Sequence, residues 1–146
     1  MNVEQILALK GRDVETVWPW ITVAQAIRRM AGPPRFGALV VCADAERRVV
    51  GILTERDLIT ALEIDGAALL DRSVEEVMSR NVPFCSPDDS LNHVMVEMTR
   101  SRHRHLPVLA DGRLVGIISI GDVVKHRLHE MELETGVLRD LYIAGH

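Results

Sequence analysis

The sequence VVGILTERD, from Val49 to Asp57, decides the fold, because it returns about 65 residues later as LVGIISIGD, from Leu114 to Asp122. In each copy a glycine lies inside an apolar run, a hydroxyl residue follows three positions later, and an aspartate follows three positions after that. The apolar run is typical of a buried strand, and the residues after the aspartate have helical spacing. The pattern therefore predicts two strand-to-helix junctions.

At each junction the hydroxyl residue, Thr54 or Ser119, is predicted to cap the helix, with Asp57 or Asp122 in its first turn. Backbone N–H groups of a first turn have no partner within the helix, so they can bind an anion or a sugar hydroxyl. The same Ser/Thr-x-x-acid spacing is that of a capping box, which only stabilises the helix end. The residues alone leave both interpretations open.

The rest of the chain also repeats. Val3–Leu7 resembles Val74–Met78 at an offset of about 71 residues, and Val17–Pro19 aligns with Cys85–Pro87 at about 68. The dipeptide Asp111-Gly112 lies between two apolar runs and predicts a two-residue hairpin turn. These matches indicate a tandem duplication.

The order of elements predicts an α+β fold of two pseudo-symmetric repeats, over residues 3–66 and 73–128. Each repeat is expected to hold a small three-stranded sheet with flanking helices, and its first strand is expected at residues 14–17 or 82–85. The Met-rich face of the helix after Ser90 is interpreted as core.

Residues 129–146 have no counterpart in the first repeat. Apolar residues recur there at near-helical spacing, which predicts an amphipathic C-terminal helix with a bend or break near Thr135-Gly136. Such a helix usually packs on its own domain or on a partner subunit.

The composition is that of a soluble globular protein: 146 residues, 47% apolar and 26% charged, with a net charge of -4. The acidic balance argues against nucleic-acid binding. No apolar run approaches the roughly 18 residues of a membrane span, and the N-terminus has no signal-peptide pattern, so we expect a cytoplasmic protein without a membrane partner. Cys42 and Cys85 form no CxxC pair and are expected to be buried, reduced thiols.

Two such repeats, each with Gly-hydrophobic-x-Ser/Thr-x-x-Asp at the end of a strand, resemble a tandem pair of CBS (cystathionine-β-synthase-type) domains, a Bateman module. The runs Thr54–Asp57 and Arg104–Val108 are typical of that family, and the resemblance covers residues 3–128. It implies a homodimeric regulatory module that binds an adenosine-containing ligand, such as AMP, ADP, ATP, NAD or S-adenosylmethionine, between its repeats. The module would signal to an effector protein that the sequence does not identify.

The resemblance implies that Asp57 and Asp122 accept hydrogen bonds from ribose hydroxyls, a task that suits a carboxylate. Thr54 and Ser119 would bind the ribose or a phosphate. Strand residues would face the adenine. These candidates are Thr16, Val17, Gly37, Ala38 and Leu39 in the first site and Phe84, Leu106 and Pro107 in the second.

A phosphate also needs cations. Arg56 and the run Arg102–His105, which includes Arg104 and His105, are the candidates, although the run could equally be a solvated loop. Gly121 replaces the equivalent of Arg56 in the second copy and removes a cation there, so the two sites are expected to differ in affinity or ligand. No Cys, Asp or Glu near His103 completes a zinc site, so no metal is expected.

The first copy has Trp18-Pro19-Trp20 where the family often has Pro-Asp. The two tryptophans either cover the adenine or pack at an interface, and packing is favoured. The sequence has no nucleophile elbow, phosphate loop or HExxH motif, so we expect no enzyme. The alternative to a sensor is a structural homodimerisation module with unoccupied clefts, in which both aspartates serve only as helix caps.

Overall fold

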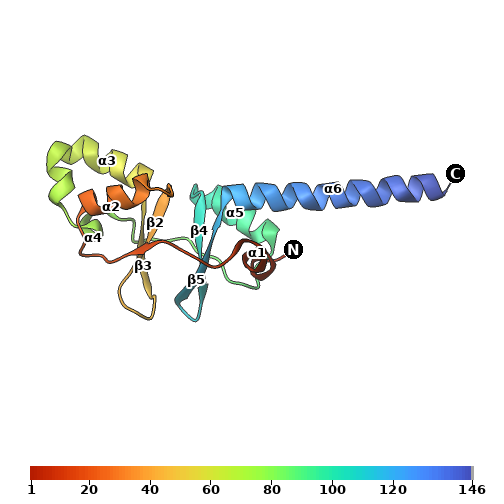
Figure 1. The fold of residues 1–146 in the computed structure, drawn as a ribbon, viewed down its shortest axis with the longest axis horizontal. Coiled ribbons are helices and arrows are strands. Elements are labelled where there is room, and N and C mark those ends of the chain that lie inside the picture. The colour runs from red at the N-terminus through yellow and green to blue at the C-terminus, as the bar shows by residue number, and fades with distance from the viewer. Residues whose placement is uncertain (146) are drawn as a thin grey trace.

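The computed structural model describes residues 1–145 and contains two small sheets with flanking helices, followed by one long helix (Figure 1). The first sheet has the order β1-β2-β3, in which β1 is parallel to β2 and β2 is antiparallel to β3. Its strands are β1 (Thr16–Val17), β2 (Ala38–Cys42) and β3 (Val49–Thr54). All five residues of β2 are buried, as expected for a strand in the middle of a covered sheet.

The second sheet is an antiparallel hairpin of β4 (His105–Ala110) and β5 (Arg113–Ser119). Its turn is Asp111-Gly112, and both residues have positive φ, 54° and 77°, as the predicted two-residue turn requires. The two hairpins lie side by side with their loops at the same end (Figure 1). A bridge between Arg48 and Arg113 joins them near those loops.

Seven helices complete the described chain. They are α1 (Val3–Lys10), α2 (Val23–Ala31), α3 (Glu55–Asp65), the 3-10 helix η1 (Gly66–Asp71), α4 (Val74–Val77), α5 (Leu91–Ser101) and α6 (Ile120–Ala144). The α+β class and the tandem arrangement are therefore confirmed. We propose the repeat boundaries 3–66 and 73–128 from the sequence, with 129–146 as the tail; its last residue, His146, lies outside the described residues.

The first helix of each repeat packs into the core of the other repeat. Leu7 of α1 is buried among residues of α5, β4 and β5, whereas Val74 of α4 and the adjacent Met78 are buried among residues of α2, β2 and β3. The repeated glycine lies where these helices cross: a Cβ on Gly116 would lie 2.7 Å from Leu7, and one on Gly51 would lie 2.4 Å from Met78. The glycine in each motif thus makes room for a helix of the other repeat.

The expected third strand of the second sheet is reduced to one residue. Cys85 forms a single parallel bridge to Val108, and residues 82–84 do not extend it. Proline has no N–H to donate, and Pro83 and Pro87 flank the bridge on both sides, which limits its length. The prediction of a strand over 82–85 is therefore wrong in extent.

The tail forms one unbroken helix with no bend or break at Thr135-Gly136. α6 runs 25 residues from Ile120 to Ala144 and extends away from the two sheets (Figure 1). A glycine inside a helix costs only about 1 kcal/mol relative to alanine, which the neighbouring helix formers offset. In residues 1–145 we find no helix with the length and apolar character needed to cross a bilayer.

Candidate functional site

The first strand-to-helix junction forms a complete capping box. Thr54 is the N-cap of α3, and its hydroxyl accepts a hydrogen bond from the N–H of Asp57 at 3.2 Å. Oδ2 of Asp57 in turn accepts hydrogen bonds from the N–H and the hydroxyl of Thr54, at 2.9 and 3.0 Å. Oδ1 accepts a further hydrogen bond from the hydroxyl of Ser79 at 2.8 Å.

The second junction has the same geometry with a different extra partner. The hydroxyl of Ser119 accepts a hydrogen bond from the N–H of Asp122. In turn, Oδ2 of Asp122 accepts hydrogen bonds from the N–H and the hydroxyl of Ser119, at 2.8 and 2.9 Å. The ammonium of Lys10, at the end of α1, donates to the same oxygen at 2.6 Å and to the carbonyl of Ile117 at 2.9 Å. Both predicted helix caps, and both aspartates in the first turn, are confirmed.

The environment of Asp122 holds it in its charged form. Burial works to raise the pKa of Asp122, but the hydrogen bonds from Lys10 and Ser119 outweigh burial, and the pKa lies below its usual value. The side chains of Lys10 and Asp122 keep only 26% and 19% of their surface exposed. Solvent therefore screens this ion pair only partly.

The two repeats meet beside these junctions. Ala38 pairs with Thr54 in the first sheet, and His105 pairs with Ser119 in the second, so both strand starts lie next to a helix N-cap. A Cβ placed on Gly37 would lie 3.2 Å from Cε1 of His105, which brings the two strand starts into contact. The structure thus gathers these predicted residues into one region.

His105 is neutral in this region. Burial lowers its pKa, and the negative charge of Asp122 works in the opposite direction but is the weaker influence. Lys10, Glu55 and Arg104 also lie within electrostatic reach of its ring. At about pH 7 the ring is therefore a hydrogen-bond donor and acceptor rather than a cation.

The predicted arginines remain available at the edge of the region. Arg56 and Arg104 are exposed, and neither forms an ion pair within residues 1–145. The carbonyl of Arg104 accepts from the N–H of Ile120 at 2.8 Å, so this arginine is fixed at the start of α6. At the second junction, where Gly121 stands in place of the Arg56 equivalent, the nearby cation is Lys10, which is bonded to Asp122. The expectation that the two sites differ in affinity or ligand stays a prediction.

Most of the apolar candidates are not on a surface. Leu39 and Leu106 are fully buried in the two cores, and Val17 is 4% exposed. Ala38 and Pro107 are also buried. Their side chains offer little surface to a ligand, because each sheet packs both faces against helices or the other hairpin.

Thr16 and Val17 instead line a cavity of about 390 Å³ on the β1 side of the first sheet, together with Trp18 and Arg29. The ring of Trp18 stacks on that of Trp20 with 5.2 Å between centroids and 5° between planes. Neither Thr54 nor Asp57 lines this cavity. The two tryptophans therefore pack on each other, and their packing at an interface stays a prediction.

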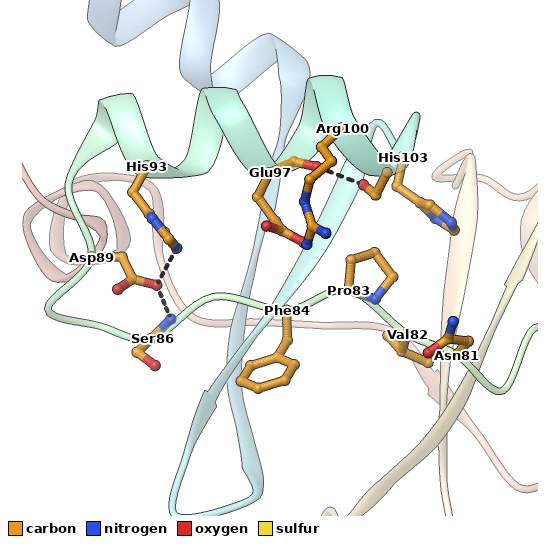
Figure 2. Close-up of a pocket in the computed structure, with 11 residues that line it drawn as sticks. Asn81, Val82, Pro83, Phe84, Ser86, Asp89, His93, Glu97, Arg100 and His103 are labelled. Atoms are coloured by element: carbon orange, nitrogen blue, oxygen red, sulfur yellow. Dashed lines mark hydrogen bonds and ion pairs between the residues drawn. The ribbon is translucent and has the colours of Figure 1, made fainter.

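Phe84 lies at a larger cavity, of about 720 Å³, between the segment 81–86 and α5 (Figure 2). His93 and Glu97 of α5 face that segment, and the Phe84 ring points away from the helix with 53% of its surface exposed. His103, from the basic run, closes one end of the cavity. The segment begins two residues after Ser79, the partner of Asp57.

Sequence reasoning missed Lys10 and Ser79. Lys10 ends α1 and Ser79 follows α4, the short helices that pack into the other repeat, and each donates to an aspartate far away in the chain. The only signal is the duplication itself, since α1 and α4 occupy equivalent places in their repeats. To find them from the sequence, one would have to know that each short helix packs against the sheet of the other repeat.

Comparisons with known proteins agree with this geometry. The family model of the CBS domain matches residues 5–64 and 74–129. The CBS domain-containing protein CBSX3, mitochondrial, of Arabidopsis thaliana is 31% identical over 99% of this chain and 72% of its own length.

Solved structures are also similar. The CBS-domain containing protein ATU1752 from Agrobacterium tumefaciens is 46% identical, with a TM-score of 0.80 over 86% of this chain and 92% of its own. The CBS domain pair of protein MJ0100, solved in complex with 5′-methylthioadenosine and S-adenosyl-L-methionine, is 26% identical, with a TM-score of 0.73 over 86% of this chain and 98% of its own. This chain belongs to the CBS domain family and forms a tandem CBS pair.

Proposed function

We propose that this protein is a regulatory module that binds adenosine-containing ligands at the N-termini of α3 and α6 and acts through a partner protein rather than by catalysis. The observation that carries the proposal is the matched pair Asp57 and Asp122. Each lies in the first turn of its helix, is hydrogen-bonded to the N-cap residue Thr54 or Ser119, and lies where the two repeats meet. A relative at 26% identity binds two adenosine compounds, which supports this class of ligand.

The chemistry of each carboxylate suits a ribose diol. The hydroxyl of Ser79 that now donates to Asp57 is the same kind of donor as a ribose hydroxyl, so a ligand can replace it without loss of a hydrogen bond. At Asp122, the ammonium of Lys10 can turn from the carboxylate to a phosphate when a ribose takes its place.

The charges around the two carboxylates favour different ligands. Asp122 is bonded to Lys10, and the neutral ring of His105 lies within electrostatic reach of Asp122, Lys10, Arg104 and Glu55. The two basic side chains favour a phosphate-bearing ligand such as AMP, ATP or NAD at this site. Asp57 has Ser79 as its extra partner and follows Glu55 and the exposed Arg56, whose charges balance, so this site favours a phosphate less than the Asp122 site does and can take S-adenosylmethionine.

Two flanking candidates lie at cavities beside the sheets. The exposed ring of Phe84, a candidate for the second site, can stack on adenine. Thr16, which lines the cavity beside the first sheet, stays a candidate for the first site. We expect the effector partner in the cytoplasm.

Calorimetric titration of Asp57→Ala and Asp122→Ala variants tests the proposal. Each variant should lose at least about tenfold in affinity for one ligand class, since a charge-assisted hydrogen bond is worth roughly 1.5–3 kcal/mol. Gln25→Ala is the matched control, because it removes the same kind of capping box from α2, outside the candidate site. It should lower stability by about 1 kcal/mol and leave ligand affinity unchanged.

A structural homodimerisation module is the second candidate. The observation that favours it is that both capping boxes are complete without a ligand, since Thr54 and Ser119 already bind Asp57 and Asp122. If both aspartate variants lose stability but, like Gln25→Ala, leave ligand affinity unchanged, or if the wild type binds no adenosine ligand, this candidate replaces the sensor.

A further inference from the structure

The outer half of α6 carries a series of exposed apolar side chains. From Met131 to Gly145 every residue is exposed except Gly136, which is half-buried. One stripe of residues begins at Val124, nearer the sheets than Met131, and its members are spaced alternately four and three residues apart. The stripe consists of Val124, Leu128, Met131, Thr135, Leu138 and Tyr142. Its apolar members are between 48% and 68% exposed.

Steps of four and three residues are the heptad spacing of a coiled coil, in which each seam residue packs between residues of a second helix. The stripe lies away from the helix face that buries Val123 and His126 against the rest of the chain. A second helix can therefore reach it along its whole length. We propose that two copies of this chain pair through α6 as a parallel, in-register coiled coil.

The charges beside the seam fix the orientation. In a parallel pair, a residue at one edge faces the residue five positions later on the second helix. Arg127 then faces Glu132 of the second copy, and Glu134 faces Arg139 of the second copy. Two-fold symmetry doubles both pairs, so four contacts of opposite charge flank the seam.

The opposite orientation brings like charges together. With the same seam layers matched antiparallel, Glu132 faces Glu132 of the second copy, and Glu134 faces its own counterpart. Lys125 then faces Arg139 of the second copy. Like charges in contact destabilise a helix pair, so this arrangement is disfavoured.

Thr135 fixes the register. It is the one polar residue of the stripe, and in the parallel, in-register pair it faces Thr135 of the second copy. A shift by one heptad would place its hydroxyl opposite Leu128 or Tyr142 and leave it against an apolar layer. A single polar seam residue of this kind selects one register at some cost in stability.

The helix provides its own control surface. Leu133 and Val137 lie on the other side of α6, with Val137 in line with Val123, and are 57% and 58% exposed. These residues are as apolar and as exposed as the seam but do not belong to it. Variants at these residues therefore distinguish pairing through the seam from non-specific association of exposed apolar side chains on the helix.

Sedimentation equilibrium of the full chain tests the seam. The wild type should sediment as a dimer at about micromolar concentration. Leu128→Gln with Leu138→Gln should weaken the dimer by at least about a hundredfold, because four buried leucines are lost per pair. Leu133→Gln with Val137→Gln should leave it unchanged. A monomeric wild type, or greater loss in the second variant, overturns the proposal; so does a larger assembly.

Two further variants test orientation and register. Thr135→Cys should form a disulfide between copies under mild oxidation, whereas Val137→Cys should not, since only the seam brings two Cα atoms within about 7 Å. Glu134→Arg should weaken pairing, and Arg139→Glu added to it should restore pairing. Cross-linking through Val137→Cys alone, or no rescue by the double variant, contradicts the parallel arrangement. The proposal does not depend on any ligand.

Discussion

The ammonium of Lys10 lies 2.6 Å from Oδ2 of Asp122, which ties the first helix of the chain to the first turn of its last helix. The contact exists because α1 packs into the core of the second repeat rather than that of its own. Asp57 has the equivalent tie to Ser79, which follows α4. Each candidate carboxylate is thus positioned by a segment at the end of the opposite repeat's short helix. We therefore expect that a ligand which displaces this partner would change how the repeats pack.

Lys10→Met should lower the free energy of unfolding by about 1–3 kcal/mol near neutral pH, because a hydrogen-bonded charge loses its partner. The lowered pKa of Asp122 gives stability that is present above the unfolded pKa of about 3.9 and lost as pH falls through the folded value. The deficit of the variant should therefore shrink in acid. Urea unfolding across this range measures it, with the exposed Lys125→Met as control. An equal deficit at all pH values would show that the ion pair is not its source.

His105 should make the protein less stable as pH falls through about 6.5. Its pKa is lowered by burial, so the unfolded chain takes up a proton before the folded chain does, and stability decreases between the unfolded and folded pKa values. His105→Gln should flatten this part of the profile, whereas the exposed His129→Gln should not. The prediction fails if the two variants keep the same slope as the wild type.

The repeated glycines should tolerate alanine unequally. Gly116→Ala places a Cβ 2.7 Å from the fully buried Leu7, and we expect a loss of about 1–3 kcal/mol. Gly51→Ala meets the flexible thioether of Met78 and should cost less. Gly136→Ala has no neighbour within 4 Å and should stabilise α6 by up to about 1 kcal/mol. Thermal unfolding ranks the three, and the reverse order would contradict the described packing.

Cys85 should resist thiol reagents until the chain unfolds. Burial raises its pKa to about 12, and burial raises that of Cys42 as well, so little thiolate forms in the native state. Labelling with an aromatic disulfide at mildly alkaline pH should follow the unfolding curve in urea. Rapid labelling of the native protein would show that one thiol is exposed.

The duplicated motif was enough to predict the junctions. Thr54 and Asp57, and their counterparts in the second copy, carry local information, since helix capping needs only residues three positions apart. The Asp111-Gly112 turn is local in the same way. Expectations that rest on short-range chemistry of this kind agree with the structure.

Expectations that depend on long-range packing agree less well. Nothing near Lys10 in the sequence indicates that it reaches Asp122. That contact exists because α1 packs into the core of the second repeat rather than that of the first. Thr135-Gly136 is a weak helix signal that the long helix overrides. Leu39 and Leu106 match the family pattern, yet their burial is decided by how both sheets pack.

A thermal-shift measurement of nucleotide-stripped protein against AMP, ATP, NAD, S-adenosylmethionine and GTP tests the central claim most directly. At about 100 times its dissociation constant, each adenosine ligand that binds should add roughly 2.7 kcal/mol and raise the melting temperature by several degrees. We predict a rise with adenosine ligands that Asp57→Ala or Asp122→Ala reduces for one ligand class each, and no rise with GTP. No rise with any adenosine ligand would contradict the sensor and favour the structural module.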